Sequence, residues 1–308
     1  MLALTLFGVF FVIALAGVPL LYAILVTTVG VIWAHGMTHP LETIFLSFIG
    51  GVEPFILLAV PLFIFAGEIL SSGGVGKRIV DFAKALLGFL PGGLGVVTVA
   101  SCLMFGGVSG SAIADTAAIG SLVIPAMIKR GYSRGFAAAL LAVAGTLALL
   151  MPLSIPFLVY AFISGVSMRQ LSMAGIVPAI VAAIGLMLVC MWHGKKTGCD
   201  SGEGRLSARE IWQATRSAGP ALLMPLIIIG GIWSGVFTPT ESAAVAVVYG
   251  IVVSLTFYRD MTARDLPRLL VNAFQTSATV MLVIGATGAL VWNALTSRRG
   301  RSRAVMSR

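Results

Sequence analysis

Phe105-Gly-Gly-Val-Ser-Gly-Ser-Ala-Ile-Ala-Asp115 is the stretch of this sequence that decides the fold. It places three glycines, two serines and a carboxylate inside an otherwise apolar run, residues 94–127. A polar side chain at membrane depth is costly without a partner, and irregular backbone is tolerated there only where it is buried in protein or lines a cavity. Because Gly106, Gly107 and Gly110 disfavour a continuous helix, we expect a re-entrant hairpin whose tip supplies oxygens and backbone groups to a transported ion and solute.

The same small residues have a second interpretation. Glycine and serine also form packing faces that let transmembrane helices approach closely. Asp115 favours the transport site, because an acidic side chain within a membrane span is rare unless function requires it. The packing face stays open as the alternative.

The composition indicates the class of protein. The chain of 308 residues is 58% hydrophobic and only 10% charged, so it cannot form an ordinary soluble surface. Its apolar runs exceed the roughly 20 residues that span a bilayer, and we predict an all-α polytopic membrane protein. The formal net charge of +9 lies in short loops between these runs, which predicts topology in a lipid bilayer and no nucleic-acid partner. Cys102, Cys190 and Cys199 have no spacing typical of a metal site or redox pair.

Residues 1–72 are predicted to form the first scaffold spans. Gly17-Val18-Pro19 interrupts the first apolar run, and the charge pattern favours two crossings there. Residues 35–53 contain no lysine or arginine and are predicted to form an external loop. His35 and His39 have the four-residue spacing of a helical metal site, but a neighbouring glycine and proline disfavour a helix, so a solvated loop is the preferred interpretation.

The middle of the chain is predicted to hold the transport core. A cytoplasmic interfacial helix is expected at residues 73–91, followed by a core at 92–192 (hairpin 92–128, broken helix 135–167, closing span 171–192) and a cytoplasmic loop at 193–216. Basic residues on both sides of the hairpin place both of its ends in the cytoplasm, which two full spans would also satisfy. Within the broken helix, Met151-Pro-Leu-Ser-Ile-Pro156 frees backbone carbonyls that can coordinate small cations.

The chain then repeats itself weakly. Ala16-Gly-Val-Pro19 has an echo in Ser234-Gly-Val-Phe-Thr-Pro239. The basic-free residues 35–53 correspond to a segment near residues 259–268 that contains three arginines. Equivalent loops on opposite sides of the membrane are the signature of an inverted-topology repeat, whose second copy is expected to start within residues 217–296.

The last residues do not fit that repeat. Residues 297–308 contain five arginines on the side predicted to be external. We therefore expect an aberrant basic tail from a truncated or frameshifted reading frame. A natural short variant with a basic tail is the alternative.

Five stretches in a fixed order carry a family resemblance. They are Phe63-Ile-Phe-Ala-Gly-Glu68, Pro91-Gly-Gly-Leu94, residues 105–115, Ile124-Pro-Ala-Met127 with Gly131-Tyr132, and Gly235-Val-Phe-Thr-Pro-Thr-Glu-Ser-Ala-Ala244. With them the chain resembles the large membrane subunit of the tripartite ATP-independent periplasmic (TRAP) transporters. The resemblance implies a sodium-coupled importer of organic anions, such as C4-dicarboxylates, in the bacterial inner membrane. It also implies two partners, a small four-helix membrane subunit and a periplasmic solute-binding protein, and no cofactor beyond the coupling sodium ion.

The resemblance assigns residues to the site. The hairpin tip receives Ser109, Gly110 and Ser111, with Asp115 close by, and the broken helix opposite receives Pro152, Ser154 and Pro156. Ser109, Ser111 and Ser154 are the expected sodium ligands. We expect the hairpin and broken helix to move together as an elevator-type carrier.

Two features of the resemblance are less direct. The family usually has Pro-Pro-Ser-Ile-Pro at the broken helix, so Leu153 replaces an expected proline. Thr238, Pro239, Thr240 and Glu241 match a family signature whose role the sequence does not provide. A buried Glu241 would suit a structural partner for a backbone break at Pro239.

Other functions remain to be distinguished. A membrane-embedded enzyme could use Asp115, Glu68 or Glu241 as acid and base, but no nucleophile has a recognisable spacing, and we predict that the chain is not an enzyme. An ion channel would need a continuous polar pore. A non-functional transporter fragment and another kind of ion-coupled anion transporter are the remaining alternatives.

Overall fold

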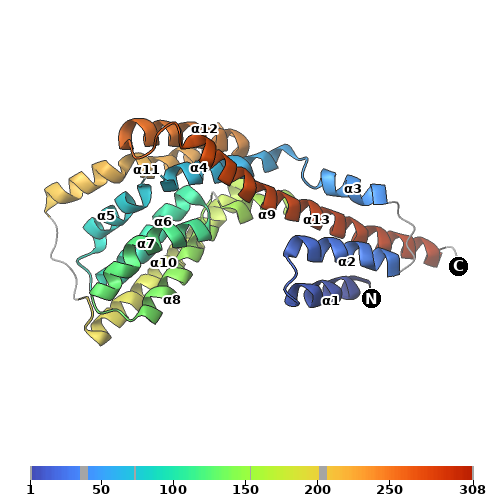
Figure 1. The fold of residues 1–308 in the computed structure, drawn as a ribbon, viewed down its shortest axis with the longest axis horizontal. Coiled ribbons are helices and arrows are strands. Elements are labelled where there is room, and N and C mark those ends of the chain that lie inside the picture. The colour runs from blue at the N-terminus through green and yellow to red at the C-terminus, as the bar shows by residue number, and fades with distance from the viewer. Residues whose placement is uncertain (1, 35–40, 73, 153, 201–206, 307–308) are drawn as a thin grey trace. The chain divides into compact units, whose positions relative to one another are not determined.

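The computed structural model describes residues 2–34, 41–72, 74–152, 154–200 and 207–306, and every regular element among them is a helix (Figure 1). Within these described ranges, six helices are long and apolar enough to cross a membrane, or seven if one bent pair is counted as a single span. The prediction of an all-α polytopic membrane protein is confirmed. The backbone divides into two compact units, Met1–Leu57 with Gln275–Arg308, and Leu58–Phe274.

The first unit begins with a helical hairpin. The hairpin consists of α1 (Leu2–Leu15) and α2 (Leu20–Ala34). The unit also contains α3 (Leu41–Gly50) and the later part of α13 (Leu266–Met306). Gly17 joins α1 to α2 with a φ of 85°, a left-handed conformation that glycine adopts without strain. The interruption near Gly17 therefore separates two helices, as predicted.

The expected external loop at residues 35–53 is wrong for its second half, which forms α3. The sequence places Ile44 and Phe48 one turn apart, so they form an apolar stripe that contacts Ala289 of α13. A methyl group on Gly285 of α13 would lie only 3.0 Å from the Phe48 ring, so glycine permits this approach. His35 and His39 lie outside the described residues.

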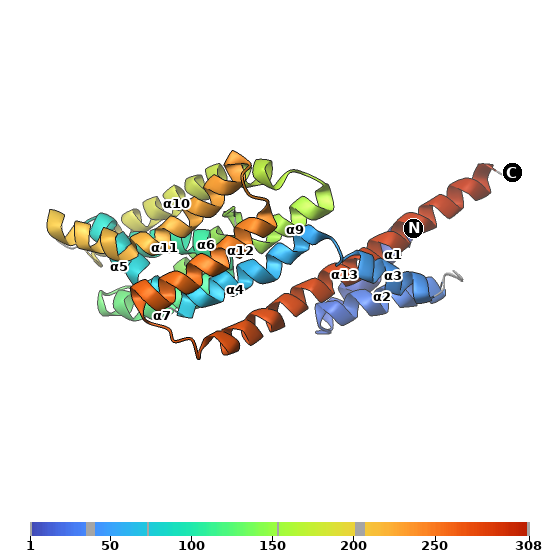
Figure 2. The same cartoon turned by 90° about the horizontal axis from the view of Figure 1, so that it is seen from above.

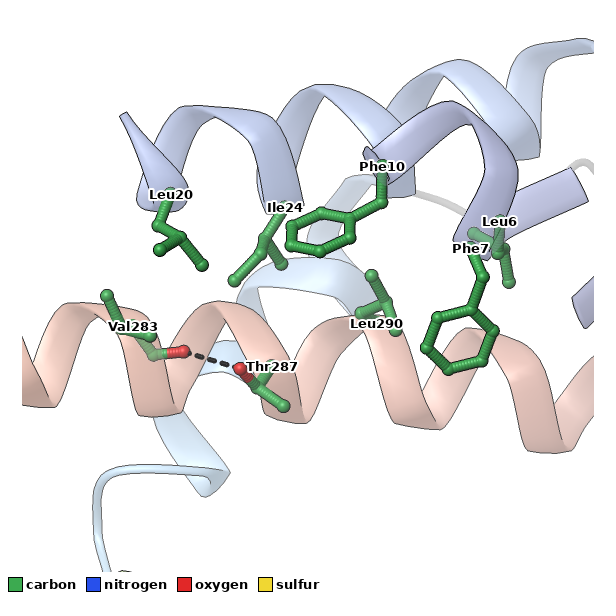
Figure 3. Close-up of a pocket in the computed structure, with 8 residues that line it drawn as sticks. All are labelled: Leu6, Phe7, Phe10, Leu20, Ile24, Val283, Thr287 and Leu290. Carbon is green, nitrogen blue, oxygen red and sulfur yellow. Dashed lines mark hydrogen bonds between the residues drawn. The ribbon is translucent and has the colours of Figure 1, made fainter. Parts of the chain in front are cut away.

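An apolar cavity of about 260 Å³ lies within the first unit (Figure 3). It is lined by Leu6, Phe7, Phe10, Leu20, Ile24, Val283, Thr287 and Leu290. Thr287 is the one polar side chain in this set, and its hydroxyl donates to the Val283 carbonyl at 2.8 Å. The cavity therefore offers no described side chain that would select a polar ligand.

The second unit contains the predicted transport core. A short 3₁₀-helix, η1 (Phe55–Leu58), leads into this unit. The first half of the unit contains α4 (Ala59–Ser72), α5 (Val75–Leu87), α6 (Gly93–Ser109), α7 (Ala112–Lys129), α8 (Arg134–Gly145) and the 3₁₀-helix η2 (Thr146–Leu150). The second half contains α9 (Ile155–Ser164), α10 (Met168–Thr197), α11 (Ala208–Ser234), α12 (Pro239–Val252), the π-helix η3 (Val253–Tyr258) and the start of α13. Both views place α12 beside α4 (Figure 2), where Gly250 contacts Ile69 and Leu70.

Helix α6 is the most buried element of the second unit. It packs against α5, α7, α8 and α10. On α5, the apolar residues Ile79 and Ala83 are fully buried one turn apart, while Lys77 and Asp81 are exposed. The helical periodicity that predicts an amphipathic helix at residues 73–91 therefore corresponds to α5.

The predicted loop at residues 193–216 is too long at both ends. Helix α10 continues to Thr197, beyond the expected closing span at 171–192, and α11 begins at Ala208. Ser207 and Glu210 start α11 with a capping box, in which each side chain accepts a hydrogen bond from the other residue's backbone N–H. The basic residues of this segment lie partly on helix ends, so the charge count did not delimit the loop.

The two copies of the weak repeat share a local turn. Gly235, with a φ of 77°, separates α11 from α12, as Gly17 separates α1 from α2. Beyond that turn α12 packs against α11, where the Tyr249 hydroxyl donates to the Pro220 carbonyl at 2.7 Å. The ion pair between Arg78 and Asp260, at 2.5 Å, brings the start of α5 and the end of the π-helix to one side of the unit.

Candidate functional site

Helices α6 and α7 form a hairpin whose tip is Gly110-Ser111. Gly110 has a φ of 60° and ends α6, and Ser111 caps α7 by accepting a hydrogen bond from the Ala114 N–H at 3.4 Å. Thr98, near the start of α6, contacts the sulfur of Met127, near the end of α7, so the helices are antiparallel. The break is confined to this tip.

Asp115 is the central charged group of the tip. Its side chain is fully buried, and its Oδ1 accepts a hydrogen bond from the Ser109 hydroxyl. The Ser109 oxygen in turn accepts from the Ser111 N–H at 3.2 Å. In the described part of the chain, Asp115 Oδ2 is buried without a hydrogen-bond partner. A buried carboxylate oxygen of this kind requires a positive charge or a proton to offset its lost hydration.

The broken helix is the second part of the site. The pair formed by α8 with η2 and by α9 is bent by 42°. Ser154 is fully buried at this break, and its hydroxyl donates to the Leu149 carbonyl at 2.8 Å. Pro156 lies in the first turn of α9, where its missing N–H costs no helical hydrogen bond. Pro152 precedes the break, and Leu153 lies outside the described residues.

The hairpin tip and the broken helix are in direct contact. A methyl group on Gly106 would lie 2.6 Å from Ala148 Cα in η2, and one on Gly107 would lie 3.1 Å from Met151 Cε. Gly106 and Gly107 are therefore not helix breakers, contrary to expectation. Both remain in α6, where Gly106 lets the backbones of α6 and η2 approach and Gly107 leaves room for the Met151 side chain. The packing interpretation therefore applies to these two glycines and the hairpin interpretation to Gly110.

A third element closes the tip from another direction. Gly67 of α4 packs against Ser109, whose carbonyl oxygen would lie 3.3 Å from a methyl group at that position. Gly67 belongs to the Phe63–Glu68 stretch that carries the resemblance. Its neighbour Glu68 is partly buried.

The open end of the hairpin is held by a residue that sequence reasoning missed. Asp200 accepts hydrogen bonds from the Leu94 N–H at 2.6 Å, from Arg130 Nη1 at 2.7 Å and from the Tyr132 hydroxyl at 3.3 Å. Its own carbonyl accepts from the Gly92 N–H at 2.9 Å. Burial, followed by the charge of Asp200, raises the pKa of Tyr132. Nothing in the local sequence marks Asp200, because its partners lie 68 to 106 residues away.

The family signature at residues 238–241 is a helix start. The Thr238 hydroxyl accepts from the Glu241 N–H at 3.3 Å, and Glu241 Oε2 accepts from the Thr238 N–H at 2.8 Å. Pro239 occupies the first turn of α12, and Thr240 is buried. Glu241 is exposed, so the interpretation of a buried Glu241 does not apply, although its carboxylate does bond backbone next to Pro239. These residues form a capping box that starts α12 directly after the Gly235 turn.

The donor set favours a hard cation bound by oxygen. Among the described residues, no group of three or more histidine, cysteine or acidic side chains could hold a metal ion. The oxygens available at the tip are those of Ser109, Asp115 and Ser111, with Ser154 on the contacting broken helix. Carboxylate, hydroxyl and carbonyl oxygens are the ligands that hard cations prefer.

Comparison with known proteins identifies the family. Residues 7–302 match the family model described as the tripartite ATP-independent periplasmic transporter, DctM component. The C4-dicarboxylate TRAP transporter large permease of Rhodobacter capsulatus is 36% identical over 99% of this chain and 72% of its own length. The 2,3-diketo-L-gulonate TRAP transporter large permease of Escherichia coli is 38% identical over 90% of this chain and 64% of its own.

A third relative is named for another solute. The isethionate TRAP transporter permease DctMQ of Oleidesulfovibrio alaskensis is 36% identical over 91% of this chain. The chain spans 44% of that relative's length. Because the family model matches residues 7–302, the chain belongs to the family of DctM components of the tripartite ATP-independent periplasmic transporters. The members of this family are multi-pass transporter subunits and not enzymes, in agreement with the several apolar helices of this chain.

Proposed function

We propose that this chain is the permease of a sodium-coupled importer of organic anions in the bacterial inner membrane. One observation carries the proposal. The buried Oδ2 of Asp115 has no described partner, at a hairpin tip that contacts a broken helix. An ion held there would neutralise the carboxylate, which is otherwise unfavourable at membrane depth.

The tip supplies the ligands of the proposed sodium site. Asp115 Oδ2 provides the negative charge, and the oxygen of Ser109 lies against the same carboxylate. Ser154 contributes lone pairs, because its hydrogen is already donated to Leu149. Ser111 and the backbone carbonyls near Pro152 complete the oxygen set that we assign to the ion.

The start of α7 provides the counterpart for the solute. Helix N-termini attract anions through their unpaired N–H groups and dipole. Ile113, in the first turn of α7, is 85% exposed, so this end of the helix reaches the molecular surface. Sodium bound beside Asp115 would stabilise the tip and with it the anion site, which is the differential interaction that coupling requires.

The solute is proposed only as a class. The three relatives above are named for a C4-dicarboxylate, for 2,3-diketo-L-gulonate and for isethionate, two carboxylates and a sulfonate. Their shared property is a negative charge on a small organic molecule. C4-dicarboxylates and related carboxylic acids are therefore the first solutes to test.

The proposed mechanism is of the elevator type. The contact of Gly106 with Ala148 joins hairpin and broken helix backbone to backbone, which supports their movement as one body. A small four-helix membrane subunit and a periplasmic solute-binding protein are the proposed partners. The binding protein would deliver the solute to the tip.

Uptake tests this proposal. Membrane vesicles carrying the chain with its small subunit receive binding protein loaded with radiolabelled succinate, with and without an inward sodium gradient. Replacing Ser109 and Ser111 together by alanine should abolish the sodium-driven component. Ser121 is an exposed serine on α7 that bonds its own helix, so S121A is the matched control and should retain uptake. Full sodium-driven uptake by the double variant would refute the assignment.

A further inference from the structure

A cavity of about 370 Å³ between α5, α11 and η3 lies apart from the hairpin tip. It is lined by Arg78, Gln213, Arg216, Ser217, Pro220, Phe257 and Tyr258. Two of these described residues are arginines, none is acidic, and three are aromatic or proline. Such a wall suits an anion that has an apolar portion next to its charge.

Arg78 is held in a fixed position at this cavity. Its Nη1 lies 2.5 Å from Asp260 Oδ2, and its guanidinium carbon lies 4.0 Å from the centre of the Tyr258 ring. Both contacts orient the guanidinium plane before any ligand arrives. Arg216 contributes from α11 and is exposed, so its charge faces solvent or a ligand.

Tyr258 connects the cavity to the backbone of α11. Its hydroxyl donates to the Ser217 carbonyl at 3.0 Å and accepts from the Ala221 N–H at 3.0 Å. Ser217 and Ala221 are four residues apart, so the phenol oxygen bonds the carbonyl and the N–H of one helical turn. The insertion lies next to Pro220, and the π-helix η3 carries Tyr258 to this position. A ligand in the cavity would therefore contact the residue that bonds the backbone of α11 beside Pro220.

Exposed aromatic side chains support a position of the cavity at a membrane surface. Trp212, next to Gln213 on α11, is 68% exposed, and Phe257 in the cavity wall is 69% exposed. Tryptophan has an amphipathic ring and concentrates at the headgroup level of a bilayer, whereas Phe257 adds exposed apolar surface to the cavity wall. The exposed Lys77 and Arg209 lie close in sequence to the two lining arginines, and clustered basic residues mark the cytoplasmic side.

We propose that this cavity binds the phosphate of an anionic phospholipid headgroup, with Arg216 and Arg78 as its cationic ligands and the acyl chains lying past Phe257. Anionic lipids are enriched where basic pockets between transmembrane helices meet the cytoplasmic leaflet. Free phosphate shares the headgroup's charge but lacks its apolar chains, so the two sources can be separated experimentally. The proposal does not depend on the transport function.

Lipid binding to the purified, delipidated chain provides the test. Native mass spectrometry in detergent measures retention of phosphatidylglycerol and, separately, phosphatidylcholine. We expect R216Q to weaken phosphatidylglycerol binding about fivefold, since each basic residue near an anionic surface is worth about 1 kcal/mol. R216K keeps the charge and should recover most of the binding. Binding of phosphatidylcholine should be unchanged in both variants.

R134Q is the matched control. Arg134 is an exposed arginine at the start of α8 and does not line the cavity. An equal loss in R134Q and R216Q would refute a specific site and indicate diffuse surface charge. Competition by millimolar inorganic phosphate that displaces phosphatidylglycerol would refute the lipid assignment. Selective loss in R216Q without such competition would support it.

Discussion

Asp200 provides a quantitative test of how the hairpin is held at its open end. The Asp200 side chain is 1% exposed, and its removal leaves the buried Leu94 N–H without an acceptor, which costs about 1–3 kcal/mol. Arg130 is 31% exposed and partly regains water, so loss of its ion pair adds about 0.5–1 kcal/mol. The free energy of unfolding of the D200G variant should therefore fall by about 1.5–4 kcal/mol.

Glycine is the appropriate replacement for Asp200. The residue has a φ of 53°, where alanine would add left-handed strain of about 1–2 kcal/mol and glycine adds none. D200A should consequently be less stable than D200G by about that amount. The comparison separates loss of the carboxylate from strain of the backbone.

D260A is the control for an ion pair at the surface. Asp260 is 37% exposed and pairs with Arg78, so its removal should cost at most about 1 kcal/mol. Unfolding in mixed detergent micelles, followed by tryptophan fluorescence, measures all three variants. Equal, small losses for D200G and D260A would refute the role assigned to Asp200.

Two further predictions concern packing and pH. G106A should destabilise the chain by about 1–3 kcal/mol, because its methyl group would lie 2.6 Å from Ala148 Cα, whereas G185A, with open space around it, should be near neutral; thermal unfolding distinguishes them. The pKa of Tyr132 is raised in the folded chain, so folding favours the neutral phenol. The resulting stability is fully present below the pKa of the unfolded chain, about 10, and is lost as the pH rises through the pKa of the folded chain. Stability of Y132F should therefore fall less between about pH 10 and 12 than that of the wild type, and an identical decline would contradict the assignment.

Local sequence signals predicted much of the fold. The turn at Gly17, the break at Gly110 and the bend after Leu150 each follow from glycine or proline within an apolar run. Glycine and proline determine the conformation of their own backbone, so their positions in the sequence are sufficient to predict these breaks. The helical character of the chain follows from hydrophobic run length in the same way.

Tertiary contacts explain what the sequence could not predict. Gly106 is compatible with either a break or a close helix contact, and only the position of Ala148 distinguishes the two. Helix α3 was missed because a charge count predicts sidedness and not secondary structure. Asp200 lies in a polar segment, and its function depends on Leu94 and Arg130, which are distant in sequence.

Sodium-dependent stability tests the central claim that a sodium ion binds at Asp115. Purified wild-type chain in detergent should gain about 1.4 kcal/mol of unfolding free energy at a sodium concentration ten times the dissociation constant, and nothing comparable in potassium. D115N preserves the shape of the side chain and should lose the sodium increment. D81N changes an exposed carboxylate on α5 and should retain it. An undiminished sodium increment in D115N would contradict the account.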